Sequence, residues 1–503
     1  MKITHRRIYL SRVEYTYMRW VVWLLAGLLF GLVSVSQLFW WLVLPAFVLF
    51  IYAISKAASW REVIIGGLLV GTLKCLGGYS FIWAAYPMAW VSLGPISQFI
   101  FIFIYWLSTA AAMGLGVVVA AAAAFFVWGN HQKYFLLVFP VIWLLGEILG
   151  SFTASVILLG PGSYLNINIG HGYAGLALAN ISLFYPFASL GGVQGLTFVA
   201  AFIGTLTYFV WTHRNWSWLK KVFWSGYGIA ALLVLYAVFP TAPVSEMGKK
   251  VIAIDTKFST SLLNSSGGEK IKAREEVGAV LAAAKTAPTI ILLPEDARLT
   301  DYLGGEEKAL AFLDSKINSN TLIVDSMRVD EEDSATLRAV YYDLEDSAVY
   351  TTDKQFLTPQ GEYISYPFIW ALRLFGHDRE IDHILQNQNY KPGKITDYQQ
   401  FPADLPGFMF CFESSSVFGL SRLVDLRESP LVLHAVSHSR FNDPHILHFQ
   451  LDSMIRAQAI YTKKSVVSAN NMANSKFYGP DGRIVKGEVI LSTEFFDLIE
   501  YNL

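Results

Sequence analysis

Long apolar runs dominate the first half of the chain. They cover approximately residues 20–36, 38–55, 63–85, 98–128, 134–152, 190–211 and 222–240. Because a helix needs about 20 apolar residues to cross a bilayer, the pattern predicts about seven membrane spans. The stretch 153–189 is also apolar, but Gly160, Pro161, Gly162 and Pro186 interrupt it. These residues favour a re-entrant or surface segment over a further span.

Basic residues fall in alternate loops between the apolar runs. They are Lys2, Arg6, Arg7, Arg12, Arg19, Lys56, Arg61, Lys133, Arg214, Lys220 and Lys221. The intervening loops, near 37, 86–97 and 153–189, contain no Lys or Arg. The positive-inside rule therefore predicts a cytoplasmic N-terminus and a second half that faces the periplasm or the cell exterior. The first run is too long for a removed signal peptide.

Two ionisable residues, Lys74 and Glu147, lie inside predicted spans. Because a charge in a bilayer is costly, such residues tend to face a cavity or a partner, and these two could line a pocket for a lipid or its headgroup. The alternative is that Lys74 reaches the interface and Glu147 lies near the end of its span.

The pattern changes after a proline-containing linker at 242–250, and short apolar strands then alternate with helices. Strands are predicted at 251–255, 289–293, 321–325, 339–344, 348–351, 407–412 and 431–436, and helices at 270–285, 306–317 and 446–463. Such alternation is typical of a sheet covered by helices. The sequence thus predicts a transmembrane helical domain over 1–241 and an α/β domain over 251–503.

Composition and charge support this division. Of the 503 residues, 54% are hydrophobic and only 15% are charged, which excludes a disordered chain and favours a membrane protein. Residues 1–241 contain 12 Lys+Arg and 3 Asp+Glu, whereas the remainder contains 26 and 36. No basic domain for nucleic acid is expected. Cys75 and Cys411 form neither a disulfide framework nor a zinc site.

Three segments of the second half could carry chemistry. Glu295 follows an apolar strand, and strand ends are where α/β enzymes place catalytic groups, although a solvated acid is the simpler interpretation. Lys354 and Glu362 flank a Pro-Gln-Gly turn, which could equally be a surface loop with a salt bridge. Cys411 ends a strand and precedes Glu413, so it is either a buried small residue or a nucleophile that needs a base within reach. Four histidines follow, and no spacing selects one of them: His434, His438, His445 and His448.

In the order Glu295, Lys354, Cys411, these residues resemble the Glu–Lys–Cys triad of the nitrilase, or carbon–nitrogen hydrolase, superfamily. The residues Lys354, Leu357, Pro359, Gly361, Glu362 and Tyr363 resemble its K-x-x-L-x-P-x-G-E-Y run, and 411–413 match its Cys-aromatic-Glu run. The preceding membrane half is similar to that of one branch, the apolipoprotein N-acyltransferases. The resemblance implies a multi-span α-helical membrane domain followed by an αββα sandwich of nitrilase type.

The resemblance also implies a reaction. A fatty acyl chain would pass from a phospholipid to the N-terminal α-amine of a diacylglyceryl-modified lipoprotein through a thioester on Cys411. Glu295 would be the general base, and Lys354 would favour the thiolate and stabilise the oxyanion. Supporting roles fall to Glu362, Phe412, Glu413 and Tyr363. The protein would be a monomer in the bacterial cytoplasmic (inner) membrane, with no cofactor and no metal.

The sequence departs from the family pattern in several places. Phe412 replaces the usual tyrosine, and 438–443 replaces the usual Asn-Asp-x-Trp-Phe-Gly segment. The family pattern has a tryptophan at a position that corresponds to 256–266, and this sequence has none there. The family pattern also has an apolar run for a further membrane span, and this sequence has none near 500. Two alternative functions therefore stay open, namely a membrane-anchored pseudoenzyme or scaffold and a tethered amidase. The apolar stretch 366–375 is either an arm that dips into the outer leaflet or part of the core.

Overall fold

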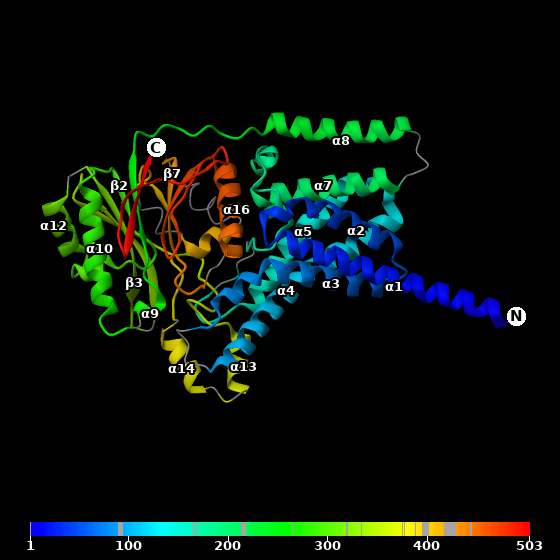
Figure 1. Cartoon of the computed structure of the whole chain (residues 1–503), viewed down its shortest axis with the longest axis horizontal. Coiled ribbons are helices and arrows are strands. Elements are labelled where there is room, and N and C mark those ends of the chain that lie inside the picture. Colours follow the sequence, from blue (N-terminus) through cyan, green and yellow to red (C-terminus); the bar gives the residue numbers. More distant parts are fainter. Residues whose placement is uncertain are drawn as a thin grey trace.

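The computed structural model describes residues 2–503 apart from 89–93, 164, 166–168, 213–217, 264, 318–319, 333, 375, 377, 388, 395–401, 417–428 and 443–444. It contains a helical half and an α/β half that lie side by side (Figure 1). Arg214, one of the basic residues that predict the topology, and Asp443 lie outside the described residues.

Each predicted apolar run coincides with a helix. The helices are α1 (Lys2–Val33), α2 (Val43–Lys56), α3 (Trp60–Gly78), α4 (Pro95–His131), α5 (Phe135–Ile157), α7 (Val193–Thr212) and α8 (Trp218–Val238), with short helices η1 (Gln37–Leu42), η2 (Ser80–Ala85) and η3 (Gln132–Tyr134) between them. Within the described residues, three helical stretches are long and apolar enough to cross a membrane: Gln37–Lys56, Pro95–Ile157 and Val193–Thr212. The second of these stretches contains both α4 and α5. Membrane crossing by α1, α3 and α8 stays a prediction.

Glycines allow α3 and α4 to approach closely. A Cβ added at Gly71 would lie 2.5 Å from the carbonyl oxygen of Gly114, so no larger residue fits at this crossing. Small residues at helix–helix contacts are typical of membrane bundles, because backbone proximity and dispersion replace the hydrophobic effect there.

The segment 153–189 forms no membrane-length helix in its described part. After α5 it contains only η4 (Ala174–Ala177), η5 (Ser182–Phe184) and α6 (Tyr185–Ala188), and most of 169–179 is buried. Its backbone reaches the other half, because the Gly170 N–H donates to the Ser415 carbonyl at 2.8 Å. The segment is therefore a packed connection between the two halves.

Lys74 and Glu147 form a buried ion pair, with 2.8 Å between Lys74 Nζ and Glu147 Oε1. The Glu147 carboxylate also accepts from Trp143 Nε1 at 3.1 Å, the Ala174 N–H at 3.0 Å and Thr197 Oγ1 at 3.1 Å. The pair joins α3, α5, η4 and α7. Both residues are almost fully buried, and neither lines a described cavity, so the structure supports neither a headgroup pocket nor a charge at the interface.

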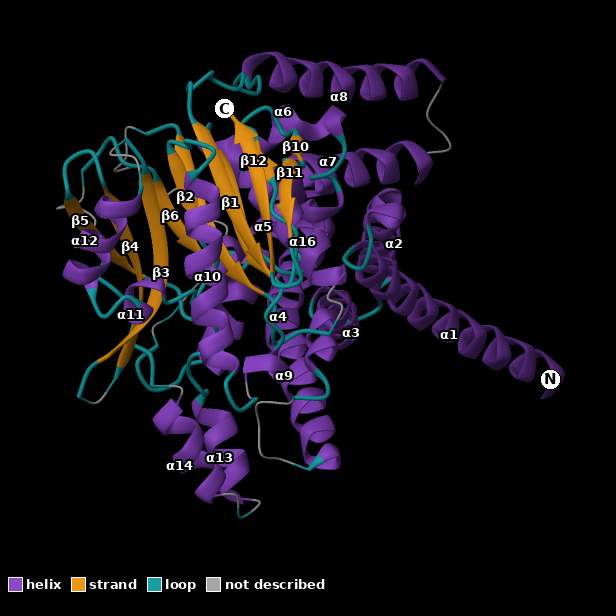
Figure 2. Ribbon diagram, turned by 60° about the vertical axis from the view of Figure 1, so that its left-hand side comes forward, coloured by secondary structure: helices purple, strands orange, loops and turns teal. Residues whose placement is uncertain are grey.

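The α/β half contains one hydrogen-bonded sheet (Figure 2). Its strands are β1 (Lys250–Thr256), β2 (Ile290–Leu292), β3 (Leu322–Asp330), β4 (Ala335–Asp343), β5 (Ala348–Asp353), β6 (Gly407–Phe410), β7 (Leu431–Ser437), β8 (Ser465–Asn471), β9 (Phe477–Tyr478), β10 (Ile484–Val485), β11 (Glu488–Ser492) and β12 (Phe496–Asn502). The runs β1–β2–β3 and β6–β7–β8 are parallel, and they meet where Thr256 pairs with Asn471. The last five of these strands, β8 to β12, were not predicted from the sequence.

Alternating side chains place apolar clusters on both faces of these strands. Ile290 and Leu292 of β2 join Phe408 and Phe410 of β6 in one cluster, so the two parallel runs pack on each other. Ile291 points the other way, toward α10 (Gly268–Ala284) and α12 (Glu306–Lys316). On the far side, the β6 face is covered by α16 (His445–Thr462). The remaining helices are α9 (Thr260–Leu263), α11 (Leu299–Tyr302), α13 (Tyr366–Leu374) and α14 (Asp378–Asn387).

Two contacts illustrate the apolar surface that the two halves share. Leu447, Leu451 and Met454 of α16 belong to the same cluster as the helical half. Phe368 of α13 packs on Phe101 of α4, with 4.9 Å between ring centroids. The interface therefore fixes the α/β half against the ends of α3 and α4.

Candidate active site

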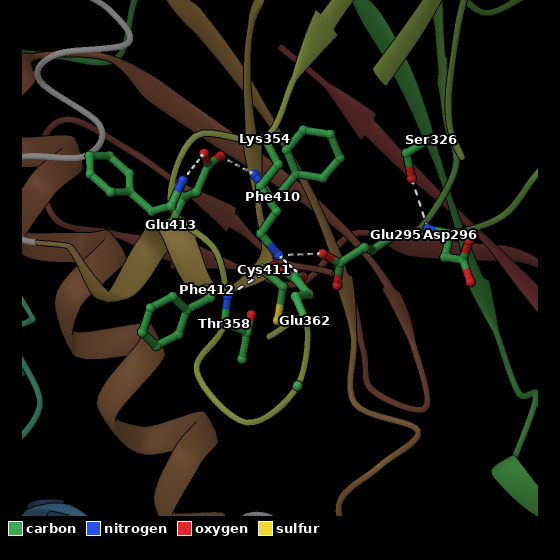
Figure 3. Close-up of polar contacts among 12 residues, drawn as sticks. Glu295, Asp296, Ser326, Lys354, Thr358, Glu362, Phe410, Cys411, Phe412 and Glu413 are labelled. Carbon is green, nitrogen blue, oxygen red and sulfur yellow. Dashed lines mark hydrogen bonds and ion pairs between the residues drawn. The ribbon is translucent and has the colours of Figure 1, made fainter. Parts of the chain in front are cut away.

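The three predicted chemical segments meet at one edge of the sheet. Glu295 follows β2, Lys354 follows β5 and Cys411 follows β6. Because β5 is antiparallel to β4, and β4 to β3, its carboxyl end lies at the same edge as that of β2. Figure 3 shows Cys411 beside the Lys354 ammonium group and Glu362.

One prediction at this edge needs correction. The strand expected over 407–412 ends at Phe410, and the short 3-10 helix η7 (Cys411–Ser415) begins at Cys411 itself. Because the chain turns away from the strand at Cys411, this side chain does not pack inside the sheet and is only half-buried.

Lys354 lies between two carboxylates. Its Nζ is 3.0 Å from Glu295 Oε1 and 2.5 Å from Glu362 Oε1 (Figure 3). Burial disfavours the charged form of Lys354, but the two carboxylates outweigh it and raise the pKa of Lys354. The lysine is therefore a permanent ammonium group beside the thiol.

Glu295 has the properties of a proton acceptor. Burial raises the pKa of Glu295, and the Lys354 ammonium opposes this rise. Its neighbour Asp296 turns away, because its carboxylate pairs with Arg298 Nε at 2.7 Å and its N–H donates to Ser326 Oγ. Of the two acids after β2, only Glu295 belongs to the lysine cluster.

Cys411 is a thiol in the resting site. Burial raises the pKa of Cys411 and Glu295 raises it further, whereas Lys354 and a hydrogen bond from the Ser437 backbone N–H lower it. A thiol with a raised pKa needs a base to become a nucleophile. The nearby Glu295 carboxylate fits that role.

The turn that precedes Glu362 positions its carboxylate near Lys354. Its Oε2 accepts the Thr358 N–H at 2.8 Å while its Oε1 contacts Lys354. Gln360 has φ 62°, and its N–H donates to the Tyr363 carbonyl at 2.8 Å, which closes the turn. The Tyr363 side chain lies against 158–163 of the helical half and is hydrogen-bonded to Ser163, so Tyr363 anchors the turn to that half.

Glu413 connects the lysine segment to the cysteine segment. Its carboxylate accepts the N–H groups of Gln355 at 2.7 Å, Phe356 at 3.2 Å and Phe410 at 2.8 Å. Burial raises the pKa of Glu413 to about 7, and these backbone hydrogen bonds oppose the rise. Glu413 therefore fixes the distance between the strand ends that carry Lys354 and Cys411.

Phe412 faces the helical half. Its ring packs against the apolar cluster of the membrane helices and lines the cavity above Cys411. The use of its backbone N–H as an oxyanion donor stays a prediction.

A cavity of about 420 Å³ opens above the cysteine. Glu295, Glu362 and Cys411 lie at one end of it, and its other wall comes from η2 and the helices of the first half: Tyr79, Phe81, Ile82, Phe101, Ile102 and Tyr105. The sequence did not reveal this wall, because residues dispersed over several apolar runs give no signal of a shared surface.

The histidines are not placed to act as a base for Cys411. His434 and His438 line a separate cavity beneath α16, and His448 Nε2 lies 3.3 Å from His438 Nδ1. Burial lowers the pKa of His434 to about 3, and its ring contacts the backbone carbonyl of Cys411. His434 is therefore a neutral core residue. From the divergent segment 438–443, Arg440 and Phe441 line the cavity above Cys411.

Comparisons with known proteins found two distant relatives that match along most of the chain. No family model matches the chain. It is 23% identical over 485 residues to the apolipoprotein N-acyltransferase of Rickettsia prowazekii (strain Madrid E), covering 93% of this chain and 88% of that protein. The protein of the same name from Rickettsia typhi (strain ATCC VR-144 / Wilmington) is also 23% identical, over 487 residues, with the same coverage. These similarities support a distant relationship to apolipoprotein N-acyltransferases.

One solved structure gives a weak match. It is a glutamine-dependent NAD(+) synthetase from Cytophaga hutchinsonii, with a TM-score of 0.31 and 12% sequence identity over 50% of this chain and 42% of that chain. This likeness is too weak to indicate a shared fold.

Proposed function

We propose that this protein is a membrane N-acyltransferase. It transfers a fatty acyl chain from a phospholipid to the N-terminal α-amine of a diacylglyceryl-modified lipoprotein through a thioester on Cys411. The proposal rests on one observation above all. The buried Lys354, with Glu295 and Glu362 on its ammonium, lies beside Cys411 at the end of a cavity whose opposite wall comes from the membrane helices.

The first half of the reaction forms the thioester. The Glu295 carboxylate takes the Cys411 proton, and the thiolate attacks the ester carbonyl of the phospholipid. The Lys354 ammonium and the Phe412 N–H stabilise the oxyanion. The ester C–O bond then breaks, and the lysophospholipid oxygen takes the proton from Glu295 as it leaves.

The second half transfers the chain to nitrogen. The lipoprotein α-amine attacks the thioester carbonyl, Glu295 takes a proton from that nitrogen, and an amide forms as the C–S bond breaks. Glu295 then returns its proton to the Cys411 thiolate. Glu362 keeps Lys354 in position through both halves, and Glu413 holds the two loops together.

The same proposal includes the fold and the location. The packed β1–β3 and β6–β8 runs, with α10 and α12 on one side and α16 on the other, support an αββα sandwich of nitrilase type. We place the protein in the bacterial inner membrane as a monomer, with this half facing the periplasm. The aromatic wall of the cavity favours a lipid substrate over the small amide that a tethered amidase would hydrolyse.

Mass spectrometry of the full chain tests the chemistry. We expect purified protein incubated with phospholipid to carry an acyl group on Cys411 that hydroxylamine removes, and to lose it when a diacylglyceryl-cysteine peptide is added. Cys411→Ala abolishes the adduct, whereas Cys75→Ala keeps it, since Cys75 is the other cysteine of the chain and is buried among the membrane helices. A folded wild-type protein without an adduct on Cys411 contradicts the proposal.

A further inference from the structure

The cavity above Cys411 is also lined by a histidine that the proposed acyl-transfer steps do not use. His171 lies in the connection between α5 and α7, and its side chain is 2% exposed. Its ring centroid is 4.8 Å from that of Phe81 and 5.6 Å from that of Tyr79. Because buried polar groups normally have hydrogen-bond partners, the two ring nitrogens need to be accounted for.

Gln450 of α16 decides which ring nitrogen carries the hydrogen. The Gln450 Nε2 group donates to the Ser34 carbonyl at 3.0 Å and to the Gly78 carbonyl at 2.8 Å, where α1 and α3 end. The opposite orientation of the amide would place its oxygen against two carbonyl oxygens. The Gln450 oxygen therefore faces His171 Nδ1, at 2.9 Å, and it can only accept. It follows that Nδ1 is the nitrogen that donates.

The other ring nitrogen, Nε2, is then an acceptor without a hydrogen. Burial lowers the pKa of His171 to about 4, so the ring is neutral at physiological pH. In a neutral imidazole with its hydrogen on Nδ1, Nε2 carries only a lone pair. Within the described part of the chain, Nε2 has no hydrogen-bond partner, and it is not one of the fully enclosed polar atoms. The structure thus leaves an acceptor at the lining of the cavity for a ligand.

The backbone holds His171 near the nucleophile. The N–H of the preceding residue, Gly170, donates to the Ser415 carbonyl at 2.8 Å. Ser415 ends the 3-10 helix that begins at Cys411, and such a helix rises about 2 Å per residue, so this attachment point lies roughly 8 Å from Cys411. His171 and Cys411 also line the same cavity. A ligand bound to Cys411 can therefore reach the His171 ring.

The chemistry of Nε2 selects between the two substrates of the proposed reaction. The acyl ester and the phosphodiester of a phospholipid offer only acceptors, whereas the lipoprotein α-amine offers N–H donors. In the second half of the reaction, the neutral amine nitrogen carries two hydrogens. One passes to Glu295 as the C–N bond forms and the C–S bond breaks, and the other stays on the nitrogen in the amide. The hydrogen that stays can bond to Nε2 while the nitrogen lone pair faces the thioester carbon.

We propose that His171 Nε2 accepts a hydrogen bond from the lipoprotein α-amine and orients it for attack on the Cys411 thioester. This inference rests on the proposed function. His171 is then a further catalytic residue, which touches the acceptor substrate and gains no proton. Gln450 is a positioning residue, because it acts through the hydrogen on Nδ1.

The test measures the two halves of the reaction separately, with the full chain in mixed micelles. Phosphatidylcholine is the acyl donor, because its headgroup has no N–H or O–H, and a diacylglyceryl-cysteine peptide is added to the preformed thioester. His171→Asn retains a donor near the position of Nδ1 and removes the Nε2 acceptor. We expect it to change the rate of thioester formation less than about twofold and to slow transfer to the peptide roughly tenfold. His171→Gln, whose amide oxygen can reach the position of Nε2, should transfer at an intermediate rate.

Two controls distinguish a contact with the amine from a structural role. His131→Asn makes the same substitution at an exposed residue at the end of α4 and should change neither rate. A peptide with an N-methyl α-amine has a single hydrogen, which Glu295 takes, so none remains for His171. The preference for the primary amine over the N-methyl amine should be roughly tenfold greater in wild-type protein than in His171→Asn. The steric effect of the methyl group is common to both proteins and cancels in this comparison.

The outcomes separate the two proposals. Wild-type protein that forms no thioester contradicts the proposed function. Where wild-type protein forms the thioester, three results overturn the assignment of His171 and leave the acyltransferase proposal intact. These are transfer by His171→Asn at the wild-type rate, equal slowing of both halves of the reaction in the two His171 variants, and an unchanged preference between the two amines.

Discussion

Replacing Lys354 by methionine should make the stability of the protein strongly dependent on pH. The Lys354 side chain is fully buried, and its ammonium is 3.0 Å from Glu295 and 2.5 Å from Glu362. Lys354→Met keeps most of the side-chain volume but leaves two carboxylates facing one another without the cation between them.

The structure indicates the size of the effect. Side-chain exposure is 11% for Glu295 and 13% for Glu362, so solvent screens the pair only weakly. Removing one partner of a buried ion pair costs roughly 3–5 kcal/mol. At about 2–4 °C per kcal/mol for a domain of this size, the apparent Tm at pH 8 should fall by roughly 10 °C.

The loss should shrink in acid. Burial already raises the pKa of Glu295, and Lys354 opposes that rise, so its removal raises the pKa of Glu295 further. In the unfolded chain this group titrates near pH 4.3. Between that value and the folded pKa, the folded variant binds more protons than the unfolded chain, and its stability therefore falls as pH rises.

The assay is thermal unfolding of wild-type and Lys354→Met protein in the same detergent at pH 5, 6, 7 and 8. The difference in Tm should grow with pH, and the double variant Lys354→Met/Glu362→Gln should recover part of it at pH 8 by removing one of the facing carboxylates. A Tm difference independent of pH, or a double variant no more stable than the single one, would refute the reasoning.

Three further predictions concern other parts of the structure. Glu413→Ala should lower the free energy of unfolding by about 3 kcal/mol or more, because three buried N–H groups lose their acceptor. Glu413→Gln should lower the free energy of unfolding less. Chemical denaturation measures both losses, and equal losses contradict this prediction. Lys74→Met should lower the apparent Tm more than Lys74→Met/Glu147→Gln, because only the single variant leaves the buried Glu147 carboxylate without its cation. Thermal unfolding in detergent measures both values of Tm. The native Trp370 side chain is 67% exposed on α13. An environment-sensitive fluorophore attached to Trp370→Cys should shift its emission to the blue in lipid vesicles, whereas the same label on Glu307→Cys of α12 should not. An equal emission shift at both sites excludes α13 as a membrane contact.

The sequence determined the helices of the first half, the strands from β1 to β7, the longer helices of the second half and the identity of the chemical groups. Each apolar run became a helix, because local hydrophobicity and helix formation depend on neighbouring residues. The resemblance carried by the Glu295, Lys354 and Cys411 segments selected the residues that meet at one sheet edge, although each segment alone also allowed a simpler interpretation. The short turn between Lys354 and Glu362 also allows the Glu362 carboxylate to contact the Lys354 ammonium group.

Only the tertiary structure decided how those groups work together. Glu295 and Lys354 are 59 positions apart, and their contact depends on the antiparallel pairing of β3, β4 and β5, which no local pattern specifies. The role of Glu413 as an acceptor for three backbone N–H groups, and the aromatic wall that the membrane helices contribute, likewise arise from packing between distant segments. Short strands such as β9 and β10 escaped prediction for the same reason, since two residues form a strand only when a partner strand is already in place.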